Sequence, residues 1–210
     1  MPALRRAPLL VAMIVAALLS LTAGVAATTA SAFSFPLTGT LLITSGDDSG
    51  GSPTGSYFVM RDPGGNPIIN SITGQTYTLL AAGTNGLRLF SYDDGPTPAF
   101  DGSGNALADT IIQPTAFFGV LFSVATPSGN PVPRIVVHLS YPSPTISVDL
   151  RAWTAYWNDQ SFNQGALFDA TSYNPISRRI VLDWSSAITS GPFTGFTGSW
   201  HVEGTLTHLH

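Results

Sequence analysis

The stretch from Pro144 to Trp157, PTISVDLRAWTAYW, decides the fold class of this chain. Its apolar and β-branched side chains recur at every second position from Ile146 to Tyr156, which is the period of a half-buried β-strand. We therefore predict one strand over residues 144–157 whose even-numbered positions face the core.

Strands of the same kind recur along the chain, and none of its segments keeps a helical period. Its 21 glycines and 16 prolines separate short β-branched or aromatic runs, as in proteins built from many strands. We predict nine strands, over residues 36–44, 56–61, 76–81, 87–92, 116–125, 134–141, 144–157, 178–185 and 196–207. The predicted fold is a single all-β domain, an antiparallel β-sandwich or jelly roll, with a closed β-barrel as the alternative. Residues 158–177 are expected to form a loop that covers a sheet face.

The first 32 residues have the order of a secretory signal peptide. Two arginines, Arg5 and Arg6, precede an apolar run from Leu9 to Ala27, and Ala30-Ser31-Ala32 forms a small-residue cleavage site. We predict cleavage after Ala32, which leaves residues 33–210 as the all-β domain. The predicted location is therefore extracellular or in the cell envelope, without stable insertion in the membrane after cleavage. An uncleaved membrane anchor is the alternative, since the apolar run is about as long as a spanning helix.

The charge of residues 33–210 excludes nucleic acid as a partner. This part contains six arginines, no lysine and twelve acidic residues, a net charge of −6. Phosphate binding requires clustered basic side chains, which an acidic chain of this kind lacks. The chain also contains no cysteine, so its stability must come from packing without disulfides.

The odd-numbered positions of residues 144–157 suggest a binding surface. Asp149, Arg151, Trp153 and Trp157 would share the outer face of a regular strand, with the two tryptophans about 13 Å apart at ~3.3 Å per residue. With Tyr156, they form a candidate platform for a carbohydrate or another envelope component. The alternative is that these tryptophans pack beneath the loop predicted at residues 158–177, because tryptophan is usually well buried.

Two further function classes stay open. A secreted hydrolase would use Asp149 and Asp183 as a carboxylate pair, although Arg151 and Arg179 on the same faces would keep those carboxylates ionised. The third class is a structural envelope protein without a small ligand. We favour the non-catalytic binding module, since the sequence lacks Cys, Gly-x-Ser-x-Gly and His-Glu-x-x-His nucleophile and metalloprotease motifs.

The sequence predicts neither a cofactor nor a zinc site. His201 and Glu203 share one face of the C-terminal strand, whereas His208 and His210 fall on the other, so these groups do not converge on a metal.

Acidic loops could bind calcium weakly, but the simpler interpretation is that their aspartates stabilise turns. Asp101, Ser103, Asn105 and Asp109 follow the spacing of an EF-hand loop, which residues 106 and 112 then break. Residues 62–66 and 101–105 both follow an Asp-x-x-Gly-Asn pattern, which predicts two similar hairpin turns.

Three segments carry a resemblance to known proteins: Thr115–Gly119, Asp149–Trp153 and Gly191–His201. With them, most of residues 33–210 resembles uncharacterised secreted β-rich proteins of actinobacterial type. The resemblance implies an exported β-rich fold and no particular activity or site residue.

Overall fold

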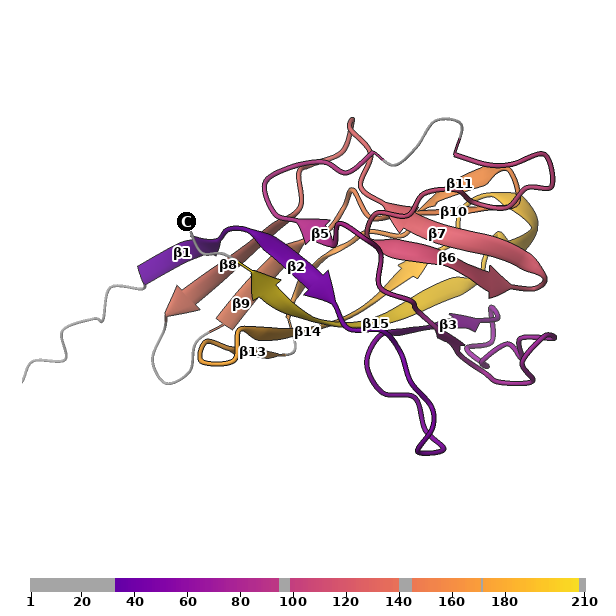
Figure 1. The fold of residues 1–210 in the computed structure, drawn as a ribbon, viewed down its shortest axis with the longest axis horizontal. Coiled ribbons are helices and arrows are strands. Elements are labelled where there is room, and N and C mark those ends of the chain that lie inside the picture. The colour runs from indigo at the N-terminus through magenta and orange to yellow at the C-terminus, as the bar shows by residue number, and fades with distance from the viewer. Residues whose placement is uncertain (1–32, 95–98, 140–144, 171, 208–210) are drawn as a thin grey trace, which may run out of the picture. The chain divides into compact units, whose positions relative to one another are not determined.

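The computed structural model describes residues 33–94, 99–139, 145–170 and 172–207 (Figure 1). Regular structure in these ranges consists of β-strands and one 3-10 turn, η1 (Gly191–Phe193), so the all-β prediction is confirmed. In the same ranges, no helix is long and apolar enough to cross a lipid bilayer. The predicted signal peptide, Met1–Ala32, lies outside the described residues, as do His208 and His210.

The described strands form three antiparallel sheets, none closed into a barrel, in the manner of a β-sandwich. The large sheet has the order β13-β14-β15-β2-β5, with β3 paired to β15 and β4 paired to β3. Its strands are β2 (Thr40–Ile43), β3 (Tyr57–Arg61), β4 (Thr78–Leu79), β5 (Leu87–Arg88), β13 (Ser172–Asn174), β14 (Arg179–Ala187) and β15 (Thr197–Thr207). The β8–β9 sheet, in the order β1-β8-β9-β12, comprises β1 (Phe33–Leu37), β8 (Arg134–Leu139), β9 (Thr145–Asp149) and β12 (Leu167–Asp169). The β7–β10 sheet, in the order β11-β10-β7-β6, comprises β6 (Ile112–Phe117), β7 (Val120–Ala125), β10 (Thr154–Trp157) and β11 (Gln160–Asn163).

Strand β15 organises the large sheet. Along one edge it pairs with β14 over the whole length of that strand, and along its other edge it pairs first with β3 and then with β2. Buried and partly exposed residues alternate along β15, as expected for a strand with one face on a core. Trp200, Val202 and Leu206 therefore point inward, and His201 and Glu203 lie on the opposite face.

One continuous core joins the three sheets. Leu182 and Val202 of the large sheet, Val148 of the β8–β9 sheet and Val124 of the β7–β10 sheet are all fully buried members of the same apolar cluster. In the view of Figure 1, the β8–β9 sheet lies at the left and the β7–β10 sheet at the right. Each fully buried side chain of this size stabilises the fold by about 1.5–3 kcal/mol, so the cluster holds the sheets together without a disulfide.

The single strand predicted over residues 144–157 is wrong, because the chain changes sheets in its middle. Strand β9 belongs to the β8–β9 sheet and β10 to the β7–β10 sheet. Between them the Trp153 amide donates a 2.7 Å hydrogen bond to the Leu150 carbonyl, which closes a turn. Leu150, Ala152 and Trp153 are all buried, so residues of both parities face the core at this bend.

The returning chain follows the same bend and makes a bent hairpin. Strand β11 pairs with β10, and β12 then pairs with β9. At the crossing point a Cβ on Gly165 would stand 2.0 Å from the Leu150 carbonyl oxygen, so the two arms approach this closely only because residue 165 is glycine. At the tip, Asn158 and Asp159 both have positive φ angles (51° and 58°), as a type I′ turn requires.

The loop predicted at residues 158–177 is therefore wrong as well. This segment contains β11, β12 and β13, each at the edge of a sheet. An edge strand needs few inward apolar residues, and in β11 only Phe162 is buried. The hydrophobic pattern is too sparse to reveal such a strand.

In the structure, two other segments that were each predicted as one strand contain two strands. The segment 36–44 breaks at Gly39 (φ 113°) and passes from β1 in the β8–β9 sheet to β2 in the large sheet. The segment 116–125 is a hairpin of β6 and β7, turned by Phe118 (φ 48°) and Gly119 (φ 80°). Bulky residues such as Phe118 seldom adopt a positive φ, so a phenylalanine does not indicate a turn. The sequence pattern therefore showed one continuous apolar run at this point. With these divisions, the described ranges contain fifteen strands where nine were predicted.

Truncating Trp153 tests the bend. Its ring is fully buried and lies edge-on to Trp184 and Trp200, with centroids 5.3 Å and 5.6 Å away. We expect Trp153→Ala to lower the free energy of unfolding by about 3–5 kcal/mol, measured by urea denaturation, because the cavity would lie where the sheets meet. The control Ile176→Ala, at a side chain 93% exposed, should change that energy by less than about 0.5 kcal/mol. A loss below about 1 kcal/mol for Trp153→Ala would contradict this role.

Candidate functional site

An aromatic pocket lies between the β7–β10 sheet and strands β3 and β15 of the large sheet. It encloses about 430 Å³ of empty space, including its open mouth. Small-molecule sites in proteins are concave and mostly apolar in their lining, as this pocket is. The pocket is lined by Phe58, Met60, Phe117, Phe122, Ala155, Trp157, Phe162, Gln164, Ile188, Phe193 and Trp200.

Two half-buried rings form the mouth of the aromatic pocket. Trp157, at the end of β10, and Phe193, in η1, have centroids 5.3 Å apart, whereas the other lining residues are buried. The Trp157 indole N–H donates a 2.9 Å hydrogen bond to the Phe117 carbonyl, which fixes the ring across the β6–β7 hairpin. The mouth is therefore a pair of aromatic surfaces with their polar N–H group already bonded.

Glycine holds η1 against β11 at this mouth. Gly191 has a φ of 71°, and a Cβ there would stand 2.4 Å from Gln160 Oε1 and 3.1 Å from the Phe162 ring. Any larger residue at position 191 would be strained by the positive φ and would displace the Gln160 side chain and tighten against the Phe162 ring.

The open surface of the aromatic pocket is apolar, and the polar side-chain atoms of its lining residues Gln164 and Trp200 are covered. The Gln164 backbone amide donates to the Trp153 carbonyl at 2.9 Å, and its carbonyl accepts the Trp184 indole N–H at 2.8 Å. Its side-chain Nε2 donates to the Asn163 carbonyl at 3.2 Å. Within the part of the chain that the structure describes, Gln164 Oε1 and Trp200 Nε1 are buried without a hydrogen-bond partner.

The predicted platform of Trp153 and Trp157 does not exist as an outer face. The bend between β9 and β10 turns Trp153 into the core, where it is fully buried, and leaves Trp157 at the mouth of the aromatic pocket. Tyr156 packs on Phe100, with ring centroids 6.0 Å apart, and burial raises the pKa of its phenol. These aromatic residues are therefore not brought together on one surface.

Asp149 and Arg151 form an ion pair beside the bend. Arg151 Nε and NH2 donate to the two Asp149 oxygens at 2.9 Å and 2.7 Å. These hydrogen bonds hold the pKa of Asp149 below its ordinary value despite partial burial. The predicted ion pairing of Asp149 is confirmed, and a carboxylate held in this way is a poor proton donor at neutral pH.

Asp183 lies on a strand that does not pair with the strand of Asp149. Asp149 ends β9 of the β8–β9 sheet, whereas Asp183 lies on β14 of the large sheet and contacts His201. Each carboxylate is thus bound to its own basic partner. The geometry offers no support for their use as a paired acid and nucleophile.

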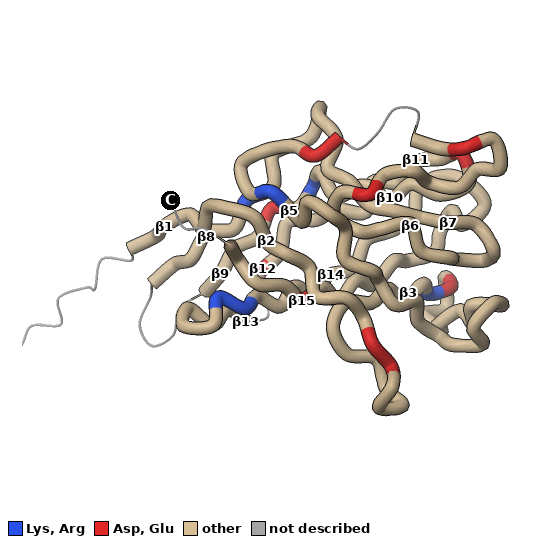
Figure 2. The backbone as a smooth tube through the Cα atoms, in the orientation of Figure 1, with Lys and Arg blue, Asp and Glu red and all other residues tan. Residues whose placement is uncertain are grey.

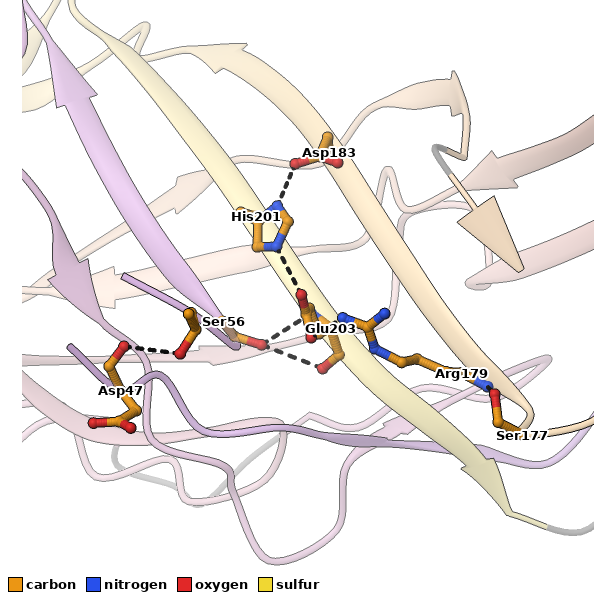
Figure 3. Close-up of polar contacts among 8 residues, drawn as sticks. Asp47, Ser56, Ser177, Arg179, Asp183, His201 and Glu203 are labelled. Carbon is orange, nitrogen blue, oxygen red and sulfur yellow. Dashed lines mark hydrogen bonds and ion pairs between the residues drawn. The ribbon is translucent and has the colours of Figure 1, made fainter. Parts of the chain in front are cut away.

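A polar chain on the outer face of the large sheet forms a second cluster, shown in Figure 3. We call Arg179, Asp183, His201 and Glu203 the His201 cluster. His201 Nδ1 lies 2.5 Å from Asp183 Oδ1, its Nε2 lies 3.2 Å from Glu203 Oε1, and Arg179 NH2 lies 2.5 Å from Glu203 Oε2. The Tyr57 ring stacks on the His201 ring with centroids 4.8 Å apart.

The His201 cluster has the geometry of a cross-strand ion network. Both ring nitrogens of His201 face carboxylates, whereas activation of a serine nucleophile would require one of them to face a hydroxyl. Because Asp183 and Glu203 lie against opposite nitrogens, they do not converge on one metal ion, and no metal-binding group of three or more ligands occurs among the described residues. Burial raises the pKa of the Tyr57 phenol, and the charges of Asp183 and Glu203 raise it further.

The two acidic loops that follow the Asp-x-x-Gly-Asn pattern have the same internal bonds. Asp62 Oδ1 accepts the Asn66 amide at 2.8 Å, and Asp101 Oδ1 accepts the Asn105 amide at 3.0 Å. The prediction of two similar turns is confirmed.

The described charged residues are scattered in the view of Figure 2, most of them in loops.

The sequence indicated only part of the aromatic pocket. The segments Thr115–Gly119 and Gly191–His201, both named among those that carry the resemblance, supply Phe117, Phe193 and Trp200 to its lining. Gln164 carried no signal, because a lone amide in a polar stretch is typical of an exposed loop.

Replacing Glu203 tests the His201 cluster through pH. Burial favours the neutral form of Glu203, but hydrogen bonds from Arg179 and His201 outweigh it and lower the pKa below the ordinary value of 4.5. The ionised carboxylate therefore stabilises the fold above that value, and its contribution is lost as the pH falls through the lowered pKa. We expect Glu203→Gln to cost about 1 kcal/mol of unfolding free energy at pH 6.

The difference between wild type and Glu203→Gln should shrink as the pH falls below 4.5, in chemical denaturation followed at several pH values. Asp169→Asn, at an exposed carboxylate on β12, is the control and should cost less than about 0.5 kcal/mol at pH 6. A difference that stays constant or widens in acid would refute the stabilising role of the Glu203 charge.

In comparisons with known proteins, no protein-family model, no curated protein and no solved structure matches this chain. The resemblance drawn from its sequence segments stays a prediction. The function must therefore be argued from the geometry of the aromatic pocket and the His201 cluster.

Proposed function

We propose that this chain is a non-catalytic binding module of the extracellular space or cell envelope that takes a small apolar ligand into the aromatic pocket. The observation that carries the proposal is the lining of that pocket. Nine of its eleven lining residues are aromatic or large aliphatic side chains, and the pocket opens to the surface between two of them, Trp157 and Phe193. Apolar surface that stays open in a monomer commonly marks a binding site.

The lining favours an apolar ligand over a carbohydrate. A sugar carries a ring of hydroxyl groups, and each one buried without a partner costs about 1–3 kcal/mol. The open surface of the described pocket is wholly apolar, so it offers the hydroxyl groups of a sugar ring no hydrogen-bond partner. An aromatic ring or a short alkyl chain would instead replace water against the phenylalanine rings at no such cost.

Export from the cell rests on the segment Met1–Ala32. Its two arginines, apolar run and Ala-Ser-Ala site support cleavage after Ala32. When the full chain is produced in a bacterial host that secretes proteins, we expect the protein outside the cytoplasm to begin at Phe33, as read by intact mass. An Ala32→Leu variant should be processed poorly, with Ala27→Leu as the matched control. Accumulation of the intact 210-residue chain in the cytoplasm would contradict export.

Toluene provides a direct test of the pocket. Trp157 and Trp200 line it, so binding should change tryptophan fluorescence excited at a wavelength where toluene does not absorb. We expect saturable binding with a Kd on the order of 1 mM or tighter for a ligand of this size. Ala155→Leu should fill the pocket and weaken toluene binding by about tenfold or more while the protein stays folded.

Ala116→Leu is the matched control, since Ala116 is exposed on β6 of the same sheet. It should bind toluene as the wild type does. A cell-wall oligosaccharide panel forms the second arm of the experiment. The proposal fails if toluene gives no saturable change, or if an oligosaccharide binds and Ala155→Leu leaves that binding intact.

A further inference from the structure

A row of polar side chains crosses the outer face of the β8–β9 sheet. Ser34 of β1, His138 of β8, Ser147 of β9 and Asp169 of β12 follow the order of the strands in that sheet. Ser34 and Asp169 are exposed, and His138 and Ser147 are partly exposed. The residue that follows Ser147, Val148, is fully buried and faces the core, so the row lies on the side open to solvent. We call these four polar residues the His138 row.

Both ring nitrogens of His138 bond to serine hydroxyls. Ser34 Oγ lies 2.7 Å from Nδ1, and Ser147 Oγ lies 2.8 Å from Nε2. Ser34 is also directly opposite His138 in the pairing of β1 with β8. His201 differs, because both of its ring nitrogens face carboxylates. Of the two histidines in the described ranges, His138 is thus the one placed as a base beside a serine.

The position of Asp169 indicates which serine donates its proton to the ring. A neutral imidazole carries one N–H, so it donates to one of the two hydroxyls and accepts from the other. Asp169 is directly opposite Ser147, and such pairs have Cβ atoms about 4.5–5.5 Å apart. An ionised carboxylate only accepts, so it favours a Ser147 proton that points toward it and a Ser147 oxygen that accepts from Nε2. Nδ1 is then the acceptor, and Ser34 donates to it.

We propose that Ser34 is a nucleophilic serine that accepts an acyl group from an activated ester, with His138 as its base. Ser34 Oγ would attack the ester carbonyl carbon while its proton passes to His138 Nδ1. When the tetrahedral intermediate collapses, the bond from that carbon to the leaving oxygen breaks, and the leaving oxygen takes the proton from His138. The products are an O-acyl serine and the free alcohol, with no oxidation or reduction.

The surface beside Ser34 favours a neutral, apolar acyl group. Pro36 and Val136 are directly opposite each other on the same outer face, next to Ser34 and His138 along their strands. Pro36 is exposed and Val136 partly exposed, so an acyl chain on Ser34 would lie over apolar surface. The charge of Asp169, at the far end of the His138 row, disfavours an anionic acyl group.

This inference goes beyond the proposed function, because it concerns another sheet. The described lining of the aromatic pocket includes no member of the His138 row. Acylation uses the Ser34 hydroxyl once, so the site is one of covalent modification and requires no turnover. Its failure would leave toluene binding in the aromatic pocket unaffected, and failure of toluene binding would leave this site unaffected.

p-Nitrophenyl butyrate tests the site, since its butyryl group is neutral and apolar. The purified protein is incubated with the ester at neutral pH, and butyrylated residues are located and timed by peptide mass spectrometry. We expect Ser34 to be butyrylated at least about tenfold faster than any other serine, because a positioned base speeds such steps by about 10²–10⁴. His138→Gln should slow the reaction at Ser34 by about tenfold or more, and the control His201→Gln should leave it unchanged.

The wild-type map tests the proposal even if His138→Gln does not fold. A Ser34 hydroxyl that reacts no faster than the other serines overturns the proposal, as does an equal rate in His138→Gln. Butyrylation of Ser147 in place of Ser34 would mean that the ring accepts its proton from the other side, which also overturns the assignment.

Ser147 is a positioning residue, since it acts on Ser34 through His138. Ser147→Ala should slow butyrylation of Ser34 by about threefold or more, because Nε2–H loses its acceptor. Ser147→Thr keeps a hydroxyl at that place and should restore the wild-type rate. Equal rates in all three proteins would overturn the proton direction argued from Asp169.

Discussion

The packing of three tryptophans, from β14, from β15 and from the bend between β9 and β10, is the interaction on which the rest of the structure depends. Trp184 and Trp200 are directly opposite each other on β14 and β15, and Trp153 meets both edge-on from the bend between the two smaller sheets. Trp153 contacts both β14 and β15, and the contact of Trp184 with Trp200 joins those two strands to each other. The cluster therefore fixes how the large sheet packs against the bend that links the β8–β9 sheet to the β7–β10 sheet. In a chain without cysteine, this aromatic packing does what a disulfide does in many exported domains.

The aromatic pocket follows from the same bend. The turn that buries Trp153 places Gln164 opposite it on the returning arm, because the Gln164 amide bonds to the Trp153 carbonyl. The Gln164 carbonyl then accepts the Trp184 indole N–H, which fixes Gln164 among the lining residues of the pocket. The bend that stabilises the fold thus also shapes one wall of the aromatic pocket.

Sequence periodicity identified the all-β class and much of β3, β8, β14 and β15, because those strands keep one face on the core throughout. It failed where the chain crosses between sheets, since an alternating pattern does not show that residues such as Leu150 and Trp153 face the core together. The candidate platform failed for that reason. The aromatic pocket was beyond the pattern, because its lining comes from strands far apart in sequence, and nothing in the neighbours of Gln164 indicates burial.

The position of β15 has a consequence for the order of folding. This last strand lies between β14 on one side and β2 and β3 on the other, so the middle of the large sheet is empty until residues 197–207 have been synthesised. Strands β3 and β2 must wait for partners about 140 and about 165 residues away along the chain. The hydrogen bond of Ser56 with Glu203 likewise joins residues 147 positions apart. Such long-range pairing slows folding. The large sheet therefore cannot be completed until residues 197–207 are available to pair with β2, β3 and β14.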